Sequence, residues 1–209
     1  SIVNFRPSYY DEMATLTEYF VTRNGFTKLA LIYQNDKFGL DCKFGIELAL
    51  KARGVTDLVS ASYERNTLVI EPAIETVIAA GKPNAIFAIG TAPVVALVIK
   101  TIRAEFGDIP FGVGSFSGGE VVRDLLVGSN QSLSNVFLSQ IVPPLTMTTV
   151  GMINEFKAAI PPSQRSASSL EGYIVGKFVA ELVRLTIADG ENITRENLID
   201  KVYSAQNFG

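Results

Sequence analysis

The clearest pattern of apolar and polar positions in the chain spans residues 28–54. Residues 29–33 are almost wholly apolar, as expected of a strand that a parallel sheet buries on both faces. Residues 34–39 contain asparagine, aspartate and glycine, which favour a tight turn because they stabilise or tolerate turn backbone conformations. The apolar residues that follow recur at helical spacing, so we expect an amphipathic helix that Asp41 caps and Gly54 ends.

This helix carries a wide apolar stripe. Phe44 and Leu48 lie on one face, with Cys42 and Ile46 beside them. Cys42 is the single cysteine, which excludes a disulfide within the chain, and its apolar neighbours favour a packing role over a reactive thiol. In open α/β sheets, ligands bind beyond the carboxyl ends of the strands, so the turn at residues 34–39 lies where a functional site is expected.

Strands and helices alternate up to residue 142. The other elements that we expect are a helix from residue 9 or 10 to 23, strand 58–63, helix 71–80, strand 85–89, helix 94–106, strand 110–113, helix 120–126 and strand 136–142. Strands that alternate with helices indicate right-handed βαβ units. The sequence therefore predicts an α/β fold, a Rossmann-like parallel sheet with helices on both faces.

The pattern changes after Pro143 and Pro144, where we expect only the helices 147–160, 169–188 and 195–205. Helix 169–188 is apolar around most of its circumference, which requires burial on more than one side. Nothing earlier in the chain supplies a second sheet. We therefore expect this helix to be covered by chain outside the 209 residues, by a second copy in a homodimer, or by a separate chain that carries the missing part.

Composition excludes several classes of function. The net charge of −3 and the lack of a run of lysine and arginine argue against nucleic-acid binding. No apolar stretch is long enough to span a bilayer, and no signal-peptide pattern occurs at Ser1, as in a cytosolic chain or in a mature or truncated product. Histidine is absent, which removes Ser-His and Cys-His catalysis and the commonest metal ligand. We expect no enzyme activity, no metal and no cofactor.

The order of several short motifs is similar to that of a known family. The motifs are FRPSYYDE, KLALIYQNDKFG, LALKARG, YERNT, KPNAIFAIGTAPVVALVIKTIRAE, FGVGSFSG, VFLSQIVPP and SLEGYIVGKFVAELV. This series resembles the type I periplasmic solute-binding proteins of the branched-chain amino acid receptor group. The resemblance implies two Rossmann-like lobes, joined by three crossovers, with the ligand in the cleft. By the same resemblance, residues 1–142 form the second lobe, and residues 143–209 form a crossover and helices of an incomplete first lobe.

The resemblance implies an extracytoplasmic, periplasmic receptor that binds a small molecule and delivers it to the membrane permease of an ABC-type importer. A second interpretation is the ligand-sensing domain of a transmembrane signalling receptor, which has the same fold. The gene sequence on either side of this chain would distinguish the two, because a sensor requires a transmembrane segment and a signalling domain. Catalysis is the third interpretation, and turnover of a small molecule would support it.

Two segments supply the first candidate ligand contacts. Ser8, Tyr9 and Tyr10 stand at the start of a helix, where free N–H groups favour an anion. The alternative is a helix cap with packed tyrosines. Phe38 occupies a position at which an aromatic residue faces the ligand in the family. The alternative for Phe38 is a solvated turn with its ring folded onto the core.

Thr91 and the Ser115–Phe116 pair complete the candidate site. Thr91 matches a family contact position and follows a strand, although a plain N-cap explains it equally well. Amino-acid receptors of the group carry a carboxylate near Ser115, whereas this chain has Phe116 there and no acid before Glu120. We therefore expect a ligand that is more apolar or aromatic than an ordinary amino acid, or an acid without an amine. We expect Tyr10, Phe38, Thr91 and Phe116 to converge on one rim.

Overall fold

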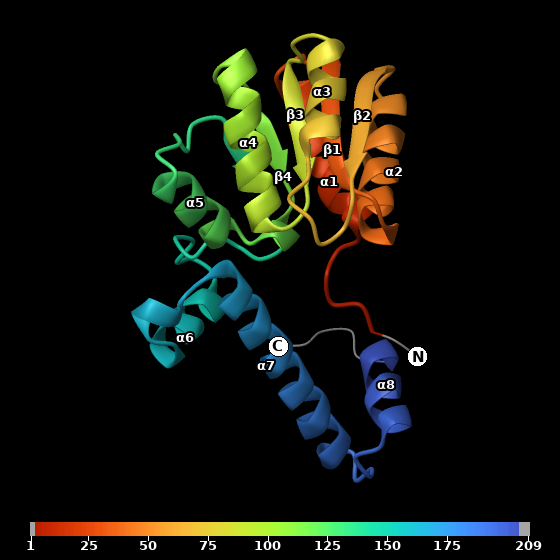
Figure 1. Cartoon of the computed structure of the whole chain (residues 1–209). Coiled ribbons are helices and arrows are strands. Elements are labelled where there is room, and N and C mark those ends of the chain that lie inside the picture. Colours follow the sequence, from red (N-terminus) through yellow and green to blue (C-terminus); the bar gives the residue numbers. More distant parts are fainter. Residues whose placement is uncertain (1–2, 205–209) are drawn as a thin grey trace. The chain divides into compact units, whose positions relative to one another are not determined.

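The computed structural model describes residues 3–204, which form two units (Figure 1). The sheet unit is Pro7–Ile141, and the helical unit combines the described residues before Pro7 with those from Val142 onward. The sheet unit ends at Ile141, and the segment before Pro7 groups with the helices and not with the sheet.

A five-stranded parallel sheet forms the centre of the sheet unit. Its strand order is β2-β1-β3-β4-β5, so the chain winds outward in one direction from β1 and in the other from β3. This is the doubly wound order whose switch point lies between β1 and β3. The fold class predicted from the sequence is therefore confirmed. The strands are β1 (Lys28–Gln34), β2 (Asp57–Tyr63), β3 (Ala85–Ile89), β4 (Phe111–Val113) and β5 (Val136–Leu138).

Helices cover both faces of this sheet (Figure 1). Leu29 and Leu31 of β1 pack with the first two helices, whereas Ala30 and Ile32 pack with the other three. The alternation explains why β1 has an unbroken apolar sequence, because successive side chains of a strand enter opposite cores. The helices are α1 (Tyr9–Thr17), which continues as a π-helix at Glu18–Arg23, α2 (Lys37–Lys51), α3 (Glu71–Ala79), α4 (Ala92–Phe106) and α5 (Gly119–Gly128).

Two expectations about α2 are wrong. The helix begins at Lys37, and its N-cap is Asp36, whose Oδ1 accepts a hydrogen bond from the Gly39 N–H at 3.0 Å. Asp41 lies one turn inside the helix, because the chain enters the helix directly after β1. The stripe is also narrower than predicted. Cys42 and Ile46 are buried, but Phe44 is 51% exposed and Leu48 is 47% exposed, because only the row of Cys42 and Ile46 packs against the sheet.

The helical unit contains α6 (Gly151–Ala159), a 3-10 turn at Pro162–Gln164, α7 (Ala167–Ala188) and α8 (Arg195–Ser204). Helix α6 starts four residues later than predicted, since residues 147–150 form turns. Helix α7 starts two residues earlier, because Ser166 and Ser169 form a reciprocal capping box. The predicted end of the last helix, Ala205, lies outside the described residues. In the sheet unit, the predicted strand 136–142 is too long, because β5 ends at Leu138.

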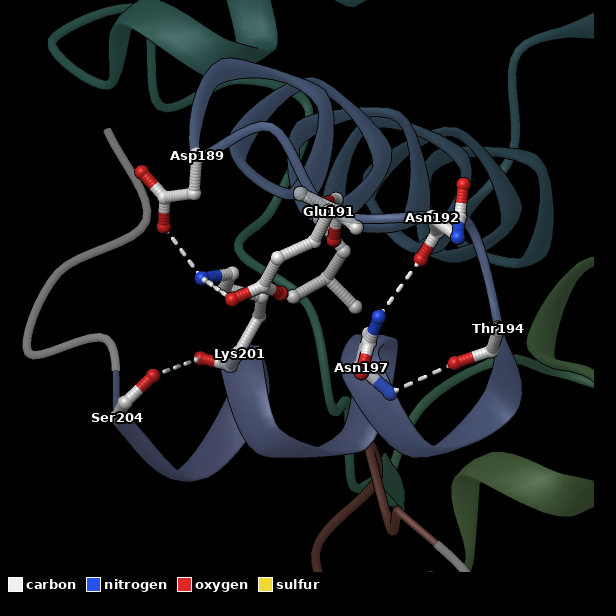
Figure 2. A network of polar contacts seen from close by, with 9 residues as sticks. Asp189, Glu191, Asn192, Thr194, Asn197, Lys201 and Ser204 are labelled. Carbon is white, nitrogen blue, oxygen red and sulfur yellow. Dashed lines mark hydrogen bonds and ion pairs between the residues drawn. The ribbon is translucent and has the colours of Figure 1, made fainter.

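The connection between α7 and α8 is held by polar contacts (Figure 2). Lys201 on α8 donates to the carboxylates of Asp189 and Glu191 that follow α7, and these carboxylates, Asp189 above all, raise the pKa of the lysine. Thr194 Oγ1 accepts a hydrogen bond from the Asn197 N–H at 3.2 Å, which caps α8. These contacts fix how α8 returns along α7 within the helical unit.

Candidate functional site

The carboxyl ends of the parallel strands define one edge of the sheet unit. The residues that follow the strands there are Asp36 after β1, Gly90 and Thr91 after β3, Ser115 after β4 and Ser139 after β5. Because all strand pairs are parallel, these residues share one edge on both sides of the switch point. This is the position at which doubly wound sheets bind ligands.

Three aromatic rings meet at this edge, and we refer to Tyr9, Phe38 and Phe116 as the aromatic cluster. The ring centroids of Phe38 and Phe116 are 4.6 Å apart, those of Tyr9 and Phe38 are 5.1 Å apart, and those of Tyr9 and Phe116 are 5.3 Å apart. All three pairs are edge-to-face, which is a favourable arrangement of aromatic quadrupoles. The rings come from α1, α2 and the turn after β4, and each is half-buried.

Tyr10 lies apart from the aromatic cluster. Its ring packs edge-to-face on Phe44 of α2 at 5.6 Å, and its hydroxyl donates to Asp41 Oδ1 at 3.3 Å. Successive helical residues point about 100° apart. Tyr9 therefore faces Phe38 and Phe116, and the structure brings Tyr9 rather than Tyr10 into contact with these two rings.

Ser8 acts as the N-cap of α1. Its Oγ accepts a hydrogen bond from the Asp11 N–H at 3.2 Å and donates to Asp11 Oδ2 at 2.7 Å, while the Ser8 N–H donates to the same carboxylate at 3.0 Å. The hydrogen bond from the Ser8 side chain is the main cause that lowers the pKa of Asp11. Of the two interpretations of Ser8, the structure shows the helix cap.

Thr91 stands at the N-cap position of α4, after the last residues of β3. Its backbone is extended and its side chain is exposed, but the hydroxyl makes no capping hydrogen bond. The helix instead starts with the Val95 N–H donating to the Thr91 carbonyl at 3.0 Å. The side chain thus does not serve as the N-cap that the sequence left as an alternative.

A buried carboxylate that sequence analysis missed lies beside Ser115. Glu12 of α1 is only 5% exposed, and it accepts hydrogen bonds from the Ser115 N–H, the Ser115 hydroxyl and the Ser139 hydroxyl. The donors lie 103 and 127 residues further along the chain. A local signal did exist, because Glu12 is next to the core residue Met13 and three residues after Tyr9, on the inward side of the helix.

The turn at Ser115–Ser117 is also fixed from β3. Ser117 Oγ donates to the Gly90 carbonyl at 2.7 Å inside the protein. The Phe116 ring lies where a Cβ on Gly114 would be, with its nearest ring atom 2.1 Å from that position, so its placement requires glycine there. The rings and the turn therefore form one closely packed structure at the strand ends.

Tyr63, at the end of β2, contacts the end of β3 at the same edge of the sheet. Its hydroxyl donates to the Ile89 carbonyl at 3.3 Å, and a Cβ on Gly90 would stand 2.0 Å from the hydroxyl oxygen. Burial raises the pKa of Tyr63 to about 12, so the hydroxyl keeps its proton at neutral pH. Tyr63 thus holds the peptide that leads into Thr91.

A groove of about 490 Å³ runs between α1 and β5 in the sheet unit. Its lining includes the apolar side chains of Leu16, Tyr19 and Phe137 and the polar side chains of Glu12 and Ser139. The volume lies within the range of small-molecule sites. No set of three or more His, Cys, Asp and Glu side chains is placed to hold a metal ion within residues 3–204. Nor does any helix in that range have the length and apolar character to cross a membrane.

Comparison with protein families identifies this architecture. A family model described as periplasmic binding protein matches residues 1–208. The chain belongs to the periplasmic binding protein family. A comparison with curated proteins gives no match. The family assignment agrees with the doubly wound sheet and with the resemblance inferred from the order of the motifs.

Solved structures of periplasmic binding proteins share the fold. A possible leucine/isoleucine/valine-binding protein from Rhodopirellula baltica SH 1 is 26% identical with a TM-score of 0.77, and the match covers 87% of this chain and 51% of that one. A substrate-binding periplasmic protein from Ralstonia solanacearum is 25% identical with a TM-score of 0.81, over 98% of this chain and 57% of the other.

A leucine-binding protein from Thermotoga maritima MSB8 has a TM-score of 0.80 at 11% identity, a likeness of fold alone, over 97% of this chain and 56% of that one. The chain thus spans a little over half the length of these periplasmic binding proteins. The relatives are described as binding proteins, which agrees with the class of function expected from the sequence.

Proposed function

We propose that this periplasmic binding protein chain contributes one ligand-binding lobe to an extracytoplasmic receptor of an ABC-type importer. The observation that carries the proposal is the aromatic cluster, which lies at the carboxyl edge of a doubly wound sheet near its switch point. Half-buried aromatic rings beside a few polar groups are typical of small-molecule sites. Tyr9, Phe38 and Phe116 would provide the apolar contacts, and the hydroxyl of Thr91 a polar one.

The proposed ligand is a small organic or aromatic acid, or an amino acid with an apolar side chain. The rings of the aromatic cluster suit an apolar or aromatic body. Glu12 brings a carboxylate to Ser115, but three protein donors already engage it, which favours a role in the fold over binding an ammonium group. The ligand class suggested by Phe116 in the sequence is therefore retained.

Transport would follow from closure of the receptor on its ligand. In a two-lobed binding protein the ligand stabilises the closed state only by as much as it prefers that state. A hinge motion of this kind gives the membrane permease a surface that differs between empty and loaded receptor. The permease and the ligand are thus the partners that we propose for the whole protein.

A thermal-shift screen on the protein expressed from its complete gene tests this proposal. The panel contains leucine, phenylalanine, benzoate and octanoate, with glucose as the comparison compound. A ligand at about a hundred times its dissociation constant raises the free energy of unfolding by about 2.7 kcal/mol. We expect at least one apolar or aromatic acid to raise the melting temperature and glucose to leave it unchanged. No rise with any acid up to millimolar concentration would contradict the proposed ligand class.

A further inference from the structure

Glu12 joins three parts of the chain at one buried point. Its Oε1 accepts from the Ser115 hydroxyl at 3.0 Å, and its Oε2 accepts from the Ser115 N–H at 3.0 Å and from the Ser139 hydroxyl at 2.7 Å. The Ser115 N–H is shared with Ser139 Oγ, also at 3.0 Å. Helix α1, the turn after β4 and the residue after β5 are therefore connected through one carboxylate.

Hydrogen bonds to a carboxylate are stronger than those between neutral groups, and burial strengthens them further. The three hydrogen bonds that Glu12 accepts come from Ser115 and Ser139. Ser115 lies next to the aromatic cluster, since Phe116 directly follows it. On the other side, Tyr9 precedes Glu12 by three residues on the same helix, so the two side chains lie on neighbouring positions of one face. The first residues of α1 thus carry both the Tyr9 ring and the Glu12 carboxylate, and this carboxylate binds the turn that carries Phe116.

We propose that Glu12 is a positioning residue for the aromatic cluster. Its carboxylate fixes the Ser115–Ser117 turn against α1 and thereby sets the distance and the edge-to-face angle between Tyr9 and Phe116. Without Glu12, the turn would keep the bond from Ser117 to the Gly90 carbonyl and the bond from the Ser115 N–H to Ser139 Oγ, but it would lose its direct bonds to α1, so we expect the Phe116 ring to shift relative to Tyr9. The proposal rests on the proposed function only in that the positioned rings serve the ligand.

A tryptophan reporter tests the role of Glu12 without a ligand. The chain contains no tryptophan, so the indole introduced by Phe38→Trp is its sole indole emitter and lies beside Phe116. We compare emission wavelength and acrylamide quenching in this background alone, with Glu12→Gln, and with Ser139→Ala. An amide cannot accept all three bonds, so we expect Glu12→Gln to shift the emission to longer wavelength and to increase quenching. Ser139→Ala removes one donor to Glu12 and one acceptor of the Ser115 N–H, but it leaves both Ser115 bonds to Glu12, so we expect a smaller change in the same direction.

Arg103→Lys is the matched control. Arg103 donates to the carbonyls of Ser132 and Ser134 and pairs with Asp108, all before β4 or β5 and hence at the opposite edge of the sheet. We expect this variant to lower the melting temperature and to leave the indole emission unchanged. A purely structural Glu12 would behave in the same way, because it would lower stability without changing the environment of the indole.

Unchanged emission and quenching in folded Glu12→Gln would overturn the proposal. If Glu12→Gln does not fold, Ser139→Ala decides: a red shift supports the proposal and an unchanged spectrum contradicts it. The measurement is independent of the thermal-shift screen. A failed screen with a red-shifted indole rejects the ligand class and keeps Glu12 as the positioning residue. A successful screen with an unchanged indole supports the ligand class and rejects the positioning role of Glu12.

Discussion

Helices with similarly apolar sequences are buried to different extents in the sheet unit and in the helical unit. In the sheet unit the apolar rows of α1 to α5 meet a sheet, and the residues of its central strands β1, β3 and β4 are almost completely buried. In the helical unit α7 buries only Leu170, Leu182 and Thr186, and Val179 and Ile187 are 48% and 58% exposed. A helix that is apolar on most sides is buried only where other elements surround it.

Part of the apolar surface of α7 does find cover within its own unit. Phe178 packs on Phe5 with centroids 5.8 Å apart, and Arg6 pairs with Glu171 at 3.0 Å. An apolar groove of about 520 Å³ lies beside α8, and the Phe5–Phe178 contact and Val179 form part of its lining. Residues that line it are Phe5, Val175, Phe178, Ile193, Leu198 and Val202. A sequence pattern therefore indicates which residues are apolar enough to be buried, whereas the surrounding elements determine whether they are buried.

The largest effect is expected from a cavity in the sheet unit. Phe87 on β3 is completely buried between Phe20 and neighbouring strands. We expect Phe87→Ala to lower the free energy of unfolding by about 3–5 kcal/mol, the range for large-to-small changes in a packed core. Denaturant titration of wild type and variant measures the difference. Val179→Ala on α7 is the comparison, and we expect it to cost less than about 1 kcal/mol because its side chain is half exposed. Equal losses at the two sites would remove the distinction between the units.

The next effect concerns ligand affinity at the aromatic cluster. We expect Phe38→Ala, in the whole protein, to weaken binding of the best compound of the thermal-shift panel by about 1–3 kcal/mol, since a buried aromatic contact is lost. Phe44→Ala is the matched control, because it removes the same side chain from the same helix at a site outside the cluster. Isothermal titration calorimetry measures both. Unchanged affinity in a folded Phe38→Ala protein would assign Phe38 to packing alone.

The sequence predicts the elements of the sheet unit better than its site. The predicted bounds of β3 agree with the structure at both ends, because five buried apolar residues lie between clear turn signals. The choice between Asp36 and Asp41 as helix cap was not decided by residue type, since either aspartate can accept from free N–H groups. The part of the site held by Glu12 was missed for a different reason. Its partners are more than a hundred residues away, and no local pattern encodes such a pairing.

A smaller effect is expected on association through the helical unit. We predict that the 209-residue chain forms a dimer at micromolar concentration, in which the groove beside α8 is covered by a second copy, or else binds a separate chain that carries a first lobe. Analytical ultracentrifugation measures the mass. Val179→Lys and Ile187→Lys together place charges on the exposed side of α7, and we expect the variant to sediment as a monomer with little loss of stability. A wild-type monomer that binds no first-lobe chain would contradict the prediction.

The smallest effect is confined to alkaline pH and distinguishes the buried row of α2 from its exposed row. Burial raises the pKa of Cys42 from 9.0 to about 12, so the folded state holds the thiol proton more tightly than the unfolded chain does. The stabilisation is fully present below pH 9 and is lost as the pH rises towards 12. We expect the free energy of unfolding to fall less steeply over this interval in Cys42→Ala than in wild type, although Tyr63 adds a slope of its own to both.

Thiol labelling tests the same burial at neutral pH. A buried, protonated thiol reacts slowly with a disulfide reagent, because the thiolate is the reactive form. We expect native Cys42 to label only at the rate at which the sheet unit opens, and to label at once in denaturant. Leu48→Cys, in a Cys42→Ala background, places a thiol on the exposed row of the same helix and should label quickly without denaturant. If the two thiols reacted at similar rates in the native protein, α2 would not present one buried and one exposed row.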